Sequence, residues 1–258
     1  MGRKIRRVIF IIALVVFIGA VGYIGYTYYG YSRDAKFYRE AVSEYVTINK
    51  PEPAQSSEAE NKEEVSGKKE LPIEVDFEAL RAVNPDIMGW IYCPDTVINY
   101  PILKAEDNDK YLRHNYLGEY ITAGSIFVEC ANSDGFADSN TIVYGHNMHD
   151  GSMFACLSKW FEQDFYEAHP VMYILTPEKN YELQLFSAYT TKAGSDAYYA
   201  ILTPCKEMND YLERAVERSK IQTRVELPED GHYVLLSTCA YLFENARSVV
   251  HGVLVPIE

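Results

Sequence analysis

An uninterrupted apolar run near the N-terminus is the strongest hydropathy pattern along the chain. Residues 8–29 contain no charged side chain, and residues 1–7 hold four basic residues and no acidic one. About 20 residues of helix span the hydrocarbon core of a bilayer. A secretory signal has a shorter apolar core, about 7–15 residues, followed by a cleavage site. The pattern predicts an uncleaved transmembrane signal anchor at 8–29, with a cytoplasmic basic tail at 1–7 and the remainder outside the cell.

A helical segment and then a polar segment follow this run. Residues 32–48 carry apolar side chains at helical spacing, which indicates a juxtamembrane helix. Residues 49–72 are rich in Pro, Ser, Glu and Lys and are almost free of apolar side chains. Such a segment buries too little surface to order itself. We therefore expect 30–72 to form a juxtamembrane helix and a flexible acidic linker, and 73–258 to form an extracellular globular domain.

The pattern from residue 73 onward is mostly that of β-strands. Short runs rich in β-branched and aromatic residues alternate with turn residues. The expected strands are 96–103, 124–129, 140–145, 171–176, 181–190, 232–239 and 248–257. Helical spacing is found at 77–84 and in a segment that begins near Pro204, with Thr203 as its possible N-cap. The pattern predicts a mainly β fold, a closed β-barrel with few helices, one of them between two late strands.

Charge and cysteine content narrow the functional classes. The 258 residues include 24 Lys and Arg against 37 Asp and Glu, a formal net charge of −13. Because four of those basic residues precede residue 8, the rest of the chain is more acidic still. A domain of this charge lacks the basic surface that phosphate backbones require, so we expect no nucleic-acid partner. Five cysteines are an odd number, so at least one thiol is free of any internal disulfide.

Cys239 differs from the other cysteines because it ends an expected strand, at the rim of a sheet. Arg247 stands eight residues later, just before the next strand, so a turn would bring its guanidinium near the sulfur. A cation beside a thiol favours the thiolate and offers donors to a developing oxyanion. An arginine that only covers the sheet rim is the alternative. Four cysteines are expected to be buried and inert, namely Cys93, Cys130, Cys156 and Cys205.

His146 follows another strand end, within TIVYGHNMHDGSMF. A histidine at such a rim acts as a general acid/base, a metal ligand or a plain loop residue. The spacing of His146 and His149 lacks the glutamate of H-E-x-x-H, and no C-x-x-C pair exists, so a metal site is disfavoured. Ser237 and Thr238 lack the G-x-S-x-G context of a serine nucleophile. Ser237 shares a strand face with Cys239 and is expected to contact whatever that cysteine attacks.

Two stretches of the chain resemble family motifs. TIVYGHNMHDGSMF is similar to the histidine motif of the sortases, and LLSTCAYLFENAR is similar to their TLxTC…R motif. GSIFVE and PILKAEDNDKYLRHN resemble the region before the family histidine, so the resemblance covers roughly 86–255. It is closest to class B sortases, which carry a helix such as 204–219 between two late strands. Leu235 stands where the family has Thr, a change that we expect the core to tolerate.

The resemblance implies a membrane-anchored cysteine transpeptidase with a sortase-type barrel and neither cofactor nor metal. Cys239 would attack an NPQTN-like C-terminal sorting motif of an exported protein and form a thioacyl intermediate. Arg247 would position the motif and stabilise the oxyanion. His146 would protonate the leaving amine and deprotonate the incoming one, an amine of the peptidoglycan peptide or a pilin lysine. The candidate substrate-binding residues are Ser237, Thr238, Tyr189 and Thr191.

Three alternatives stay open at this point. A surface cysteine protease would use the same cysteine and histidine but deliver the acyl group to water. A non-catalytic wall-binding module would not depend on Cys239. A zinc hydrolase would use His146 and His149 and would be sensitive to chelators.

Overall fold

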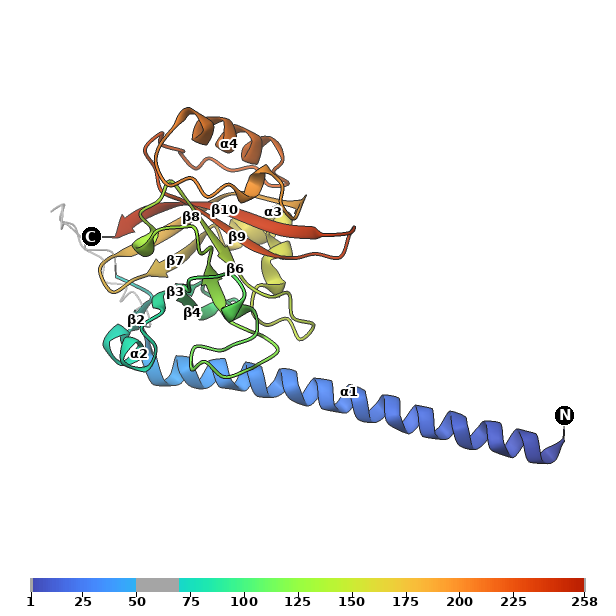
Figure 1. The fold of residues 1–258 in the computed structure, drawn as a ribbon. Helices are drawn as coiled ribbons and strands as arrows, with labels where there is room; N and C mark the ends of the chain where they lie inside the picture. The colour runs from blue at the N-terminus through green and yellow to red at the C-terminus, as the bar shows by residue number, and fades with distance from the viewer. Residues whose placement is uncertain (1, 50–69, 258) are drawn as a thin grey trace, which may run out of the picture.

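Within residues 2–49 and 70–257, which the computed structural model describes, eight strands close into a β-barrel (Figure 1). The order around the barrel is β10-β8-β7-β3-β4-β5-β6-β9, and the β4–β5 and β6–β9 pairs are parallel. The closed barrel predicted from the strand pattern is therefore confirmed. The strands are β3 (Ile87–Tyr92), β4 (Asn99–Leu103), β5 (Ile126–Val128), β6 (Asn140–Tyr144), β7 (Val171–Leu175), β8 (Asn180–Lys192), β9 (Tyr233–Cys239) and β10 (Ala246–Ile257).

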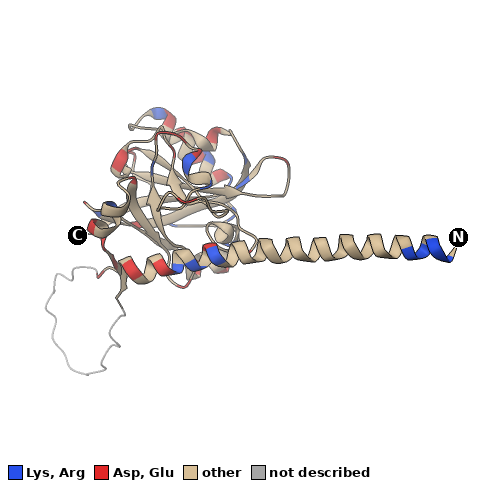
Figure 2. Cartoon of the chain, turned by 60° about the horizontal axis from the view of Figure 1, so that its bottom comes forward, with Lys and Arg blue, Asp and Glu red and all other residues tan. Residues whose placement is uncertain are grey.

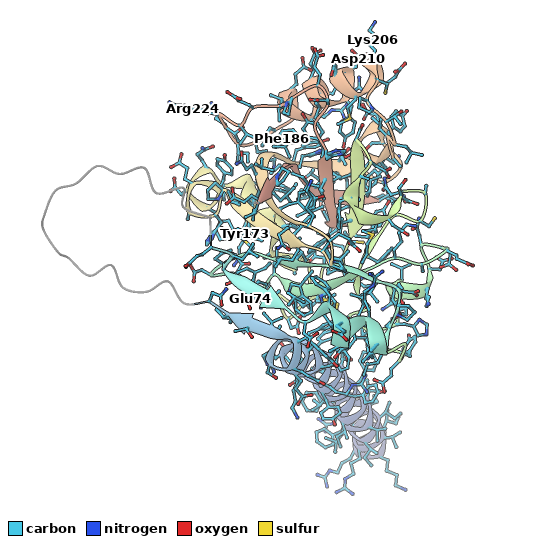
Figure 3. The ribbon with its side chains drawn as sticks, turned by 90° about the vertical axis from the view of Figure 1, so that its left-hand side faces the viewer. Glu74, Tyr173, Phe186, Lys206, Asp210 and Arg224 are labelled. Carbon is cyan, nitrogen blue, oxygen red and sulfur yellow. The ribbon has the colours of Figure 1, made fainter. Side chains whose placement is uncertain are left out.

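Helices cover the barrel at two ends. α4 lies over the outer face of β8, β9 and β10, at the end of the molecule opposite α1 (Figure 1). Figure 3 shows Lys206 and Asp210 of α4 at that end, with Phe186 of β8 beneath the helix. The helical segments are α1 (Arg3–Tyr45), α2 (Phe77–Val83), η1 (Lys110–Leu112), η2 (Asp134–Phe136), η3 (Ala155–Phe161), α3 (Gln163–Ala168), η4 (Asp196–Tyr198) and α4 (Lys206–Glu217).

Both faces of β9 are buried, which explains its nearly continuous apolar sequence. Val234 and Leu236 belong to the cluster that fills the barrel, whereas Tyr233 and Leu235 pack with Met208 of α4 on the outside. Because side chains alternate between the two faces of a strand, Ser237 and Cys239 share the outer face with Tyr233 and Leu235. The candidate nucleophile therefore lies outside the barrel core.

The sequence analysis missed one strand and placed the start of one helix wrongly. β3 was not expected, because its sequence IMGWIY is buried on both faces and so lacks the alternation that marks a half-buried strand. The late helix begins at Lys206, and its N-cap is Cys205 in extended conformation, not Thr203. The residue before a proline is restricted toward extended conformations. Here the chain stays extended through Cys205, so the helix starts two residues later than predicted.

α1 is a single helix of 43 residues that includes the expected span and most of the expected juxtamembrane helix. It is long and apolar enough to cross a membrane, which makes it a candidate membrane span. Figure 2 shows its basic N-terminal end, an uncharged stretch, and charged residues where it meets the barrel. There it packs directly on the barrel and buries Asp34, Tyr38, Ala41 and Tyr45.

A two-stranded sheet joins the end of α1 to the start of the barrel domain. β1 (Val46–Ile48) follows α1 at once and pairs antiparallel with β2 (Ile73–Val75). The Asn49 amide N–H donates to the Pro72 carbonyl at 2.9 Å. The two ends of segment 49–72 therefore lie side by side, so this segment does not set the distance between helix and barrel. Most of the expected acidic linker, residues 50–69, lies outside the described residues.

Candidate active site

The register between β9 and β10 places Cys239 directly opposite Arg247. Opposite residues of an antiparallel pair project to the same face, with Cβ atoms about 4.5–5.5 Å apart. On the other side of β10, Thr191 of β8 lies opposite Arg247. A row of three side chains therefore crosses three strands at the rim of the barrel. The Cys239–Arg247 juxtaposition expected from the eight-residue spacing is present.

The next row inward on the same face contains Ser237 and Tyr189, both opposite Val249. Ser237 is buried, and its Oγ lies 2.7 Å from the hydroxyl of Tyr198. Tyr189 is also buried, and its ring stacks on His251. Both therefore lie below the rim, whereas Thr191 is half-buried and stands in the row of Arg247.

Thr238 lies on the opposite face of β9 from Cys239, toward the barrel interior. It is buried, and its Oγ1 has no hydrogen-bond partner among the described residues. Of the four residues predicted to bind substrate, only Thr191 is on the row that joins Cys239 and Arg247. Their roles as substrate-binding residues stay predictions.

His146 reaches the same rim from β6, which runs parallel to β9. Its two chain neighbours are both bonded to β9. The Gly145 amide donates to the Ser237 carbonyl at 3.1 Å, and Asn147 Nδ2 donates to the Cys239 carbonyl at 2.7 Å. These bonds hold His146 at the end of β9 that carries Cys239. A Cβ on residue 145 would lie 2.7 Å from a ring carbon of Phe154, so any larger residue here would have to displace that ring.

The imidazole of His146 is held by a backbone carbonyl. Nε2 lies 2.8 Å from the Leu112 oxygen. Because a carbonyl only accepts hydrogen bonds, Nε2 carries a proton, and in the neutral ring Nδ1 has the free lone pair. Burial lowers the pKa of His146; the Leu112 bond opposes this effect and the charge of Arg113 adds to it. The resting imidazole is therefore favoured in its neutral form.

Tyr198 is a site residue that the sequence analysis missed. Besides its contact with Ser237, its ring stacks on Tyr144 with centroids 6.3 Å apart. Burial raises the pKa of Tyr198 to about 12, while Arg247 lowers it and Cys239 raises it. The hydroxyl therefore stays protonated at neutral pH and lies within electrostatic reach of both residues. Tyr198 belongs to η4, between β8 and α4, and no motif marks it in the sequence.

The other four cysteines differ from one another. Cys93 and Cys156 are buried, and burial raises the pKa of their thiols to about 12 and about 11. Both therefore remain thiols, as expected of inert cysteines. Cys130 is half-buried and Cys205 is exposed, which corrects the expectation that all four would be buried. Cys205 is exposed because it is the N-cap of α4, at the surface end of the helix.

His149 lies apart from any metal-like cluster. Its ring stacks on Tyr241, with centroids 6.3 Å apart. Among residues 2–49 and 70–257, no group of three or more His, Cys, Asp or Glu side chains is arranged to hold a metal ion.

Comparison with known proteins identifies the family. The sortase domain family matches residues 91–255 of the chain. Sortase B of Listeria monocytogenes is 41% identical over 180 residues, which cover 68% of this chain and 72% of that protein. The chain belongs to the class B sortases. It is therefore a cysteine transpeptidase of the family that anchors proteins to the cell wall, and the resemblance seen in the sequence is confirmed.

Solved sortase B structures share the fold of this sortase. The Staphylococcus aureus sortase B–substrate complex aligns with a TM-score of 0.67 and 31% identity, over 70% of this chain and 85% of that chain. A sortase B complexed with triglycine aligns with a TM-score of 0.66 and 32% identity, over 70% of this chain and 86% of that chain.

Proposed function

We propose that this sortase cleaves a C-terminal sorting motif of exported proteins and joins the acyl part to an amine of the cell-wall peptide. The observation that carries the proposal is the meeting of Cys239, Arg247 and His146 at one end of β9. A thiol, a cation and an imidazole at one rim are the groups that acyl transfer through a thioester requires. A solved sortase B–substrate complex and a triglycine complex among the relatives support the two substrate classes.

The first half-reaction uses the neutral histidine. The Cys239 sulfur attacks the scissile carbonyl and forms a C–S bond, while its proton passes to Nδ1 of His146, because Nε2 is engaged with Leu112. The tetrahedral intermediate then expels the amine, which takes that proton from Nδ1. The acyl group stays on Cys239 as a thioester, and His146 is again neutral.

The second half-reaction reverses these steps with a new amine. The acceptor amine attacks the thioester carbonyl and gives a proton to His146. The amide forms, the thiolate leaves, and the proton returns to sulfur. Sulfur is released as thiol and the histidine as neutral imidazole, so the enzyme is regenerated.

Arg247 is the proposed oxyanion and substrate-backbone ligand. One N–H of its guanidinium, on Nη1, donates to the Ala246 carbonyl at 3.0 Å. A guanidinium has five N–H donors, so most remain for the substrate on the face that Cys239 shares. Preorganised donors of this kind stabilise the charge that develops on the carbonyl oxygen.

We also place the sortase in the membrane by its N-terminal helix. Residues 1–7 remain in the cytoplasm, residues 8–29 cross the bilayer, and the barrel lies outside. The proposal is supported by the apolar composition of α1 and by the basic residues before it (Figure 2). It puts the catalytic rim on the side where exported proteins and peptidoglycan are found.

Product analysis with the full chain in nanodiscs tests the chemistry. The enzyme is incubated with NPQTN-like and related peptides, with and without triglycine, and products are identified by mass spectrometry. We expect an amine-linked product that requires triglycine and is lost in Cys239→Ala, His146→Ala and Arg247→Ala. Cys205→Ala, at an exposed cysteine outside the site, serves as the matched control and keeps wild-type activity. Hydrolysed product alone, whether or not triglycine is present, would favour a protease.

A further inference from the structure

Two buried polar side chains of the membrane helix α1 form hydrogen bonds with one loop of the barrel. Asp34 of α1 lies just beyond the expected span, and its Oδ2 accepts the amide N–H groups of Thr122 at 2.9 Å and Ala123 at 3.1 Å. One turn further, the Tyr38 hydroxyl donates to the Gly124 carbonyl and lies 3.1 Å from Ser125 Oγ. The loop that precedes β5 therefore lies against α1 (Figure 1).

This loop is bonded to the segment that contains Leu112. The Ser125 amide donates to the Tyr111 carbonyl at 2.9 Å, and Ser125 Oγ donates to the His114 carbonyl at 2.8 Å. Gly124 has a φ of +55°, and a Cβ there would lie 2.5 Å from the Leu112 oxygen. The backbone of 122–125 is therefore in close contact with the carbonyl that Leu112 presents to His146.

We propose that Asp34 and Tyr38 are positioning residues for His146. The side chains of α1 are hydrogen-bonded to the backbone of 122–125, which lies against the Leu112 carbonyl. That carbonyl in turn lies 2.8 Å from Nε2 of His146. The membrane helix then sets the orientation of the imidazole as well as the location of the barrel. This inference rests on the catalytic role proposed for His146.

The buried carboxylate of Asp34 indicates a role beyond packing α1 against the barrel. Asp34 is only 1% exposed, and burying a carboxylate is costly unless it is hydrogen-bonded. An apolar side chain would be sufficient to pack a helix on a barrel. A carboxylate oxygen that accepts two consecutive N–H groups instead fixes where the loop backbone lies. The pair Arg33–Asp34, at 3.2 Å, engages the other oxygen, so Oδ2 remains for the loop.

Variants in the full chain in nanodiscs test the inference. Asp34→Ala removes both loop bonds, and Tyr38→Phe removes the hydroxyl while keeping the ring. We expect kcat of amide transfer to fall by about tenfold in each, with KM changed less than about twofold, because misplaced catalytic groups cost rate and not substrate affinity. The ¹⁵N resonance of His146 Nε2 shifts in the same variants, because it reports the Leu112 bond. Asp34→Asn restores most of kcat, since one amide oxygen can accept both N–H groups.

Two control variants match these changes. Arg33→Ala removes the cation beside Asp34 and leaves the loop bonds. Tyr45→Phe changes another buried tyrosine of α1, whose ring packs on Tyr116. Both are expected to keep wild-type kcat and the wild-type Nε2 resonance.

The outcomes separate this inference from the proposed function. Wild-type kcat and an unshifted Nε2 resonance in Asp34→Ala and Tyr38→Phe would overturn the inference, even if both variants unfold at lower temperature. An equal fall of kcat in the controls would also overturn it, because the effect would then be general destabilisation. An active His146→Ala enzyme would overturn the catalytic role of His146 on which the inference rests. A wild-type enzyme that forms only hydrolysed product in the presence of triglycine would overturn the proposed function itself.

Discussion

Replacing Asn147 by Ala removes the side-chain bond that joins the histidine loop to the nucleophile strand. Asn147 Nδ2 donates to the Cys239 carbonyl at 2.7 Å. Its neighbour His146 is also held to β9 by the Gly145 amide, to the Leu112 carbonyl by its own ring, and through its backbone carbonyl by the Phe154 amide at 3.0 Å. Truncation therefore removes one of the bonds that hold the histidine loop to β9, while the Gly145 bond and the pairing of Cys239 with Arg247 remain.

The expected fall of kcat can be estimated from the free energy of the Asn147–Cys239 hydrogen bond. A neutral hydrogen bond in a partly buried position contributes a net of about 0.5–1.5 kcal/mol to the folded geometry. If the loss of this bond raises the activation free energy by the same amount, because His146 and Cys239 are held less firmly, kcat falls about twofold to tenfold. KM is expected to change less, because Asn147 is bonded to the enzyme's own backbone and the row of Thr191 and Arg247 is left intact.

Steady-state amide transfer to triglycine measures the effect, with Asn49→Ala as the matched control. Asn49 also donates from Nδ2 to a backbone carbonyl, that of Leu71, at 3.0 Å, but at the β1–β2 sheet. The control should keep wild-type kcat. Unchanged kcat in Asn147→Ala, or a loss confined to KM, would refute the argument that this bond aligns the two reacting groups.

Three further predictions concern Arg247, Tyr198 and His251. Arg247→Lys loses the guanidinium fork and should lower kcat about 10²-fold, measured in the same transfer assay. Tyr198→Phe removes the hydroxyl beside Ser237 and should lower kcat by less than about tenfold without changing the dependence on triglycine concentration. Burial lowers the pKa of His251 to about 3, below its unfolded value of about 6.5. Stability is therefore complete above pH 6.5 and declines as the pH falls toward 3, by about 2 kcal/mol at pH 5. Thermal unfolding of wild type and His251→Gln at pH 7 and pH 5 checks this, and an equal pH effect in both would contradict it.

The Cys239–Arg247 pair could be predicted from the sequence because it is local. Two strand-like runs separated by a short turn form a hairpin, and the hairpin register brings the two residues together. The location of His146 is different, since it depends on the parallel pairing of β6 with β9, which are far apart in the chain. Its strand-end position was visible in the sequence, but only the family resemblance indicated that it would meet Cys239.

The remaining misses have physical causes. The contact of His146 with Leu112 uses a backbone carbonyl, which every residue has, so no residue type marks it. Ser237 was placed on the correct strand face and Tyr189 was named as a substrate-binding candidate, but the depth of both below the rim depends on how α4 covers that face. The composition of 49–72 indicated a polar linker but contained no sign that the residues on either side of it would pair as β1 and β2.

Trapping the acyl-enzyme tests the central claim most directly. The full-length sortase is incubated with a sorting-motif peptide without amine, its intact mass and peptide map are recorded, and triglycine is then added. The account predicts that the acyl half of the peptide is attached to Cys239 and is transferred to triglycine on the chase. A folded wild-type enzyme that yields cleaved peptide while Cys239 remains unmodified, or whose Cys239→Ala variant still forms the product, would contradict it.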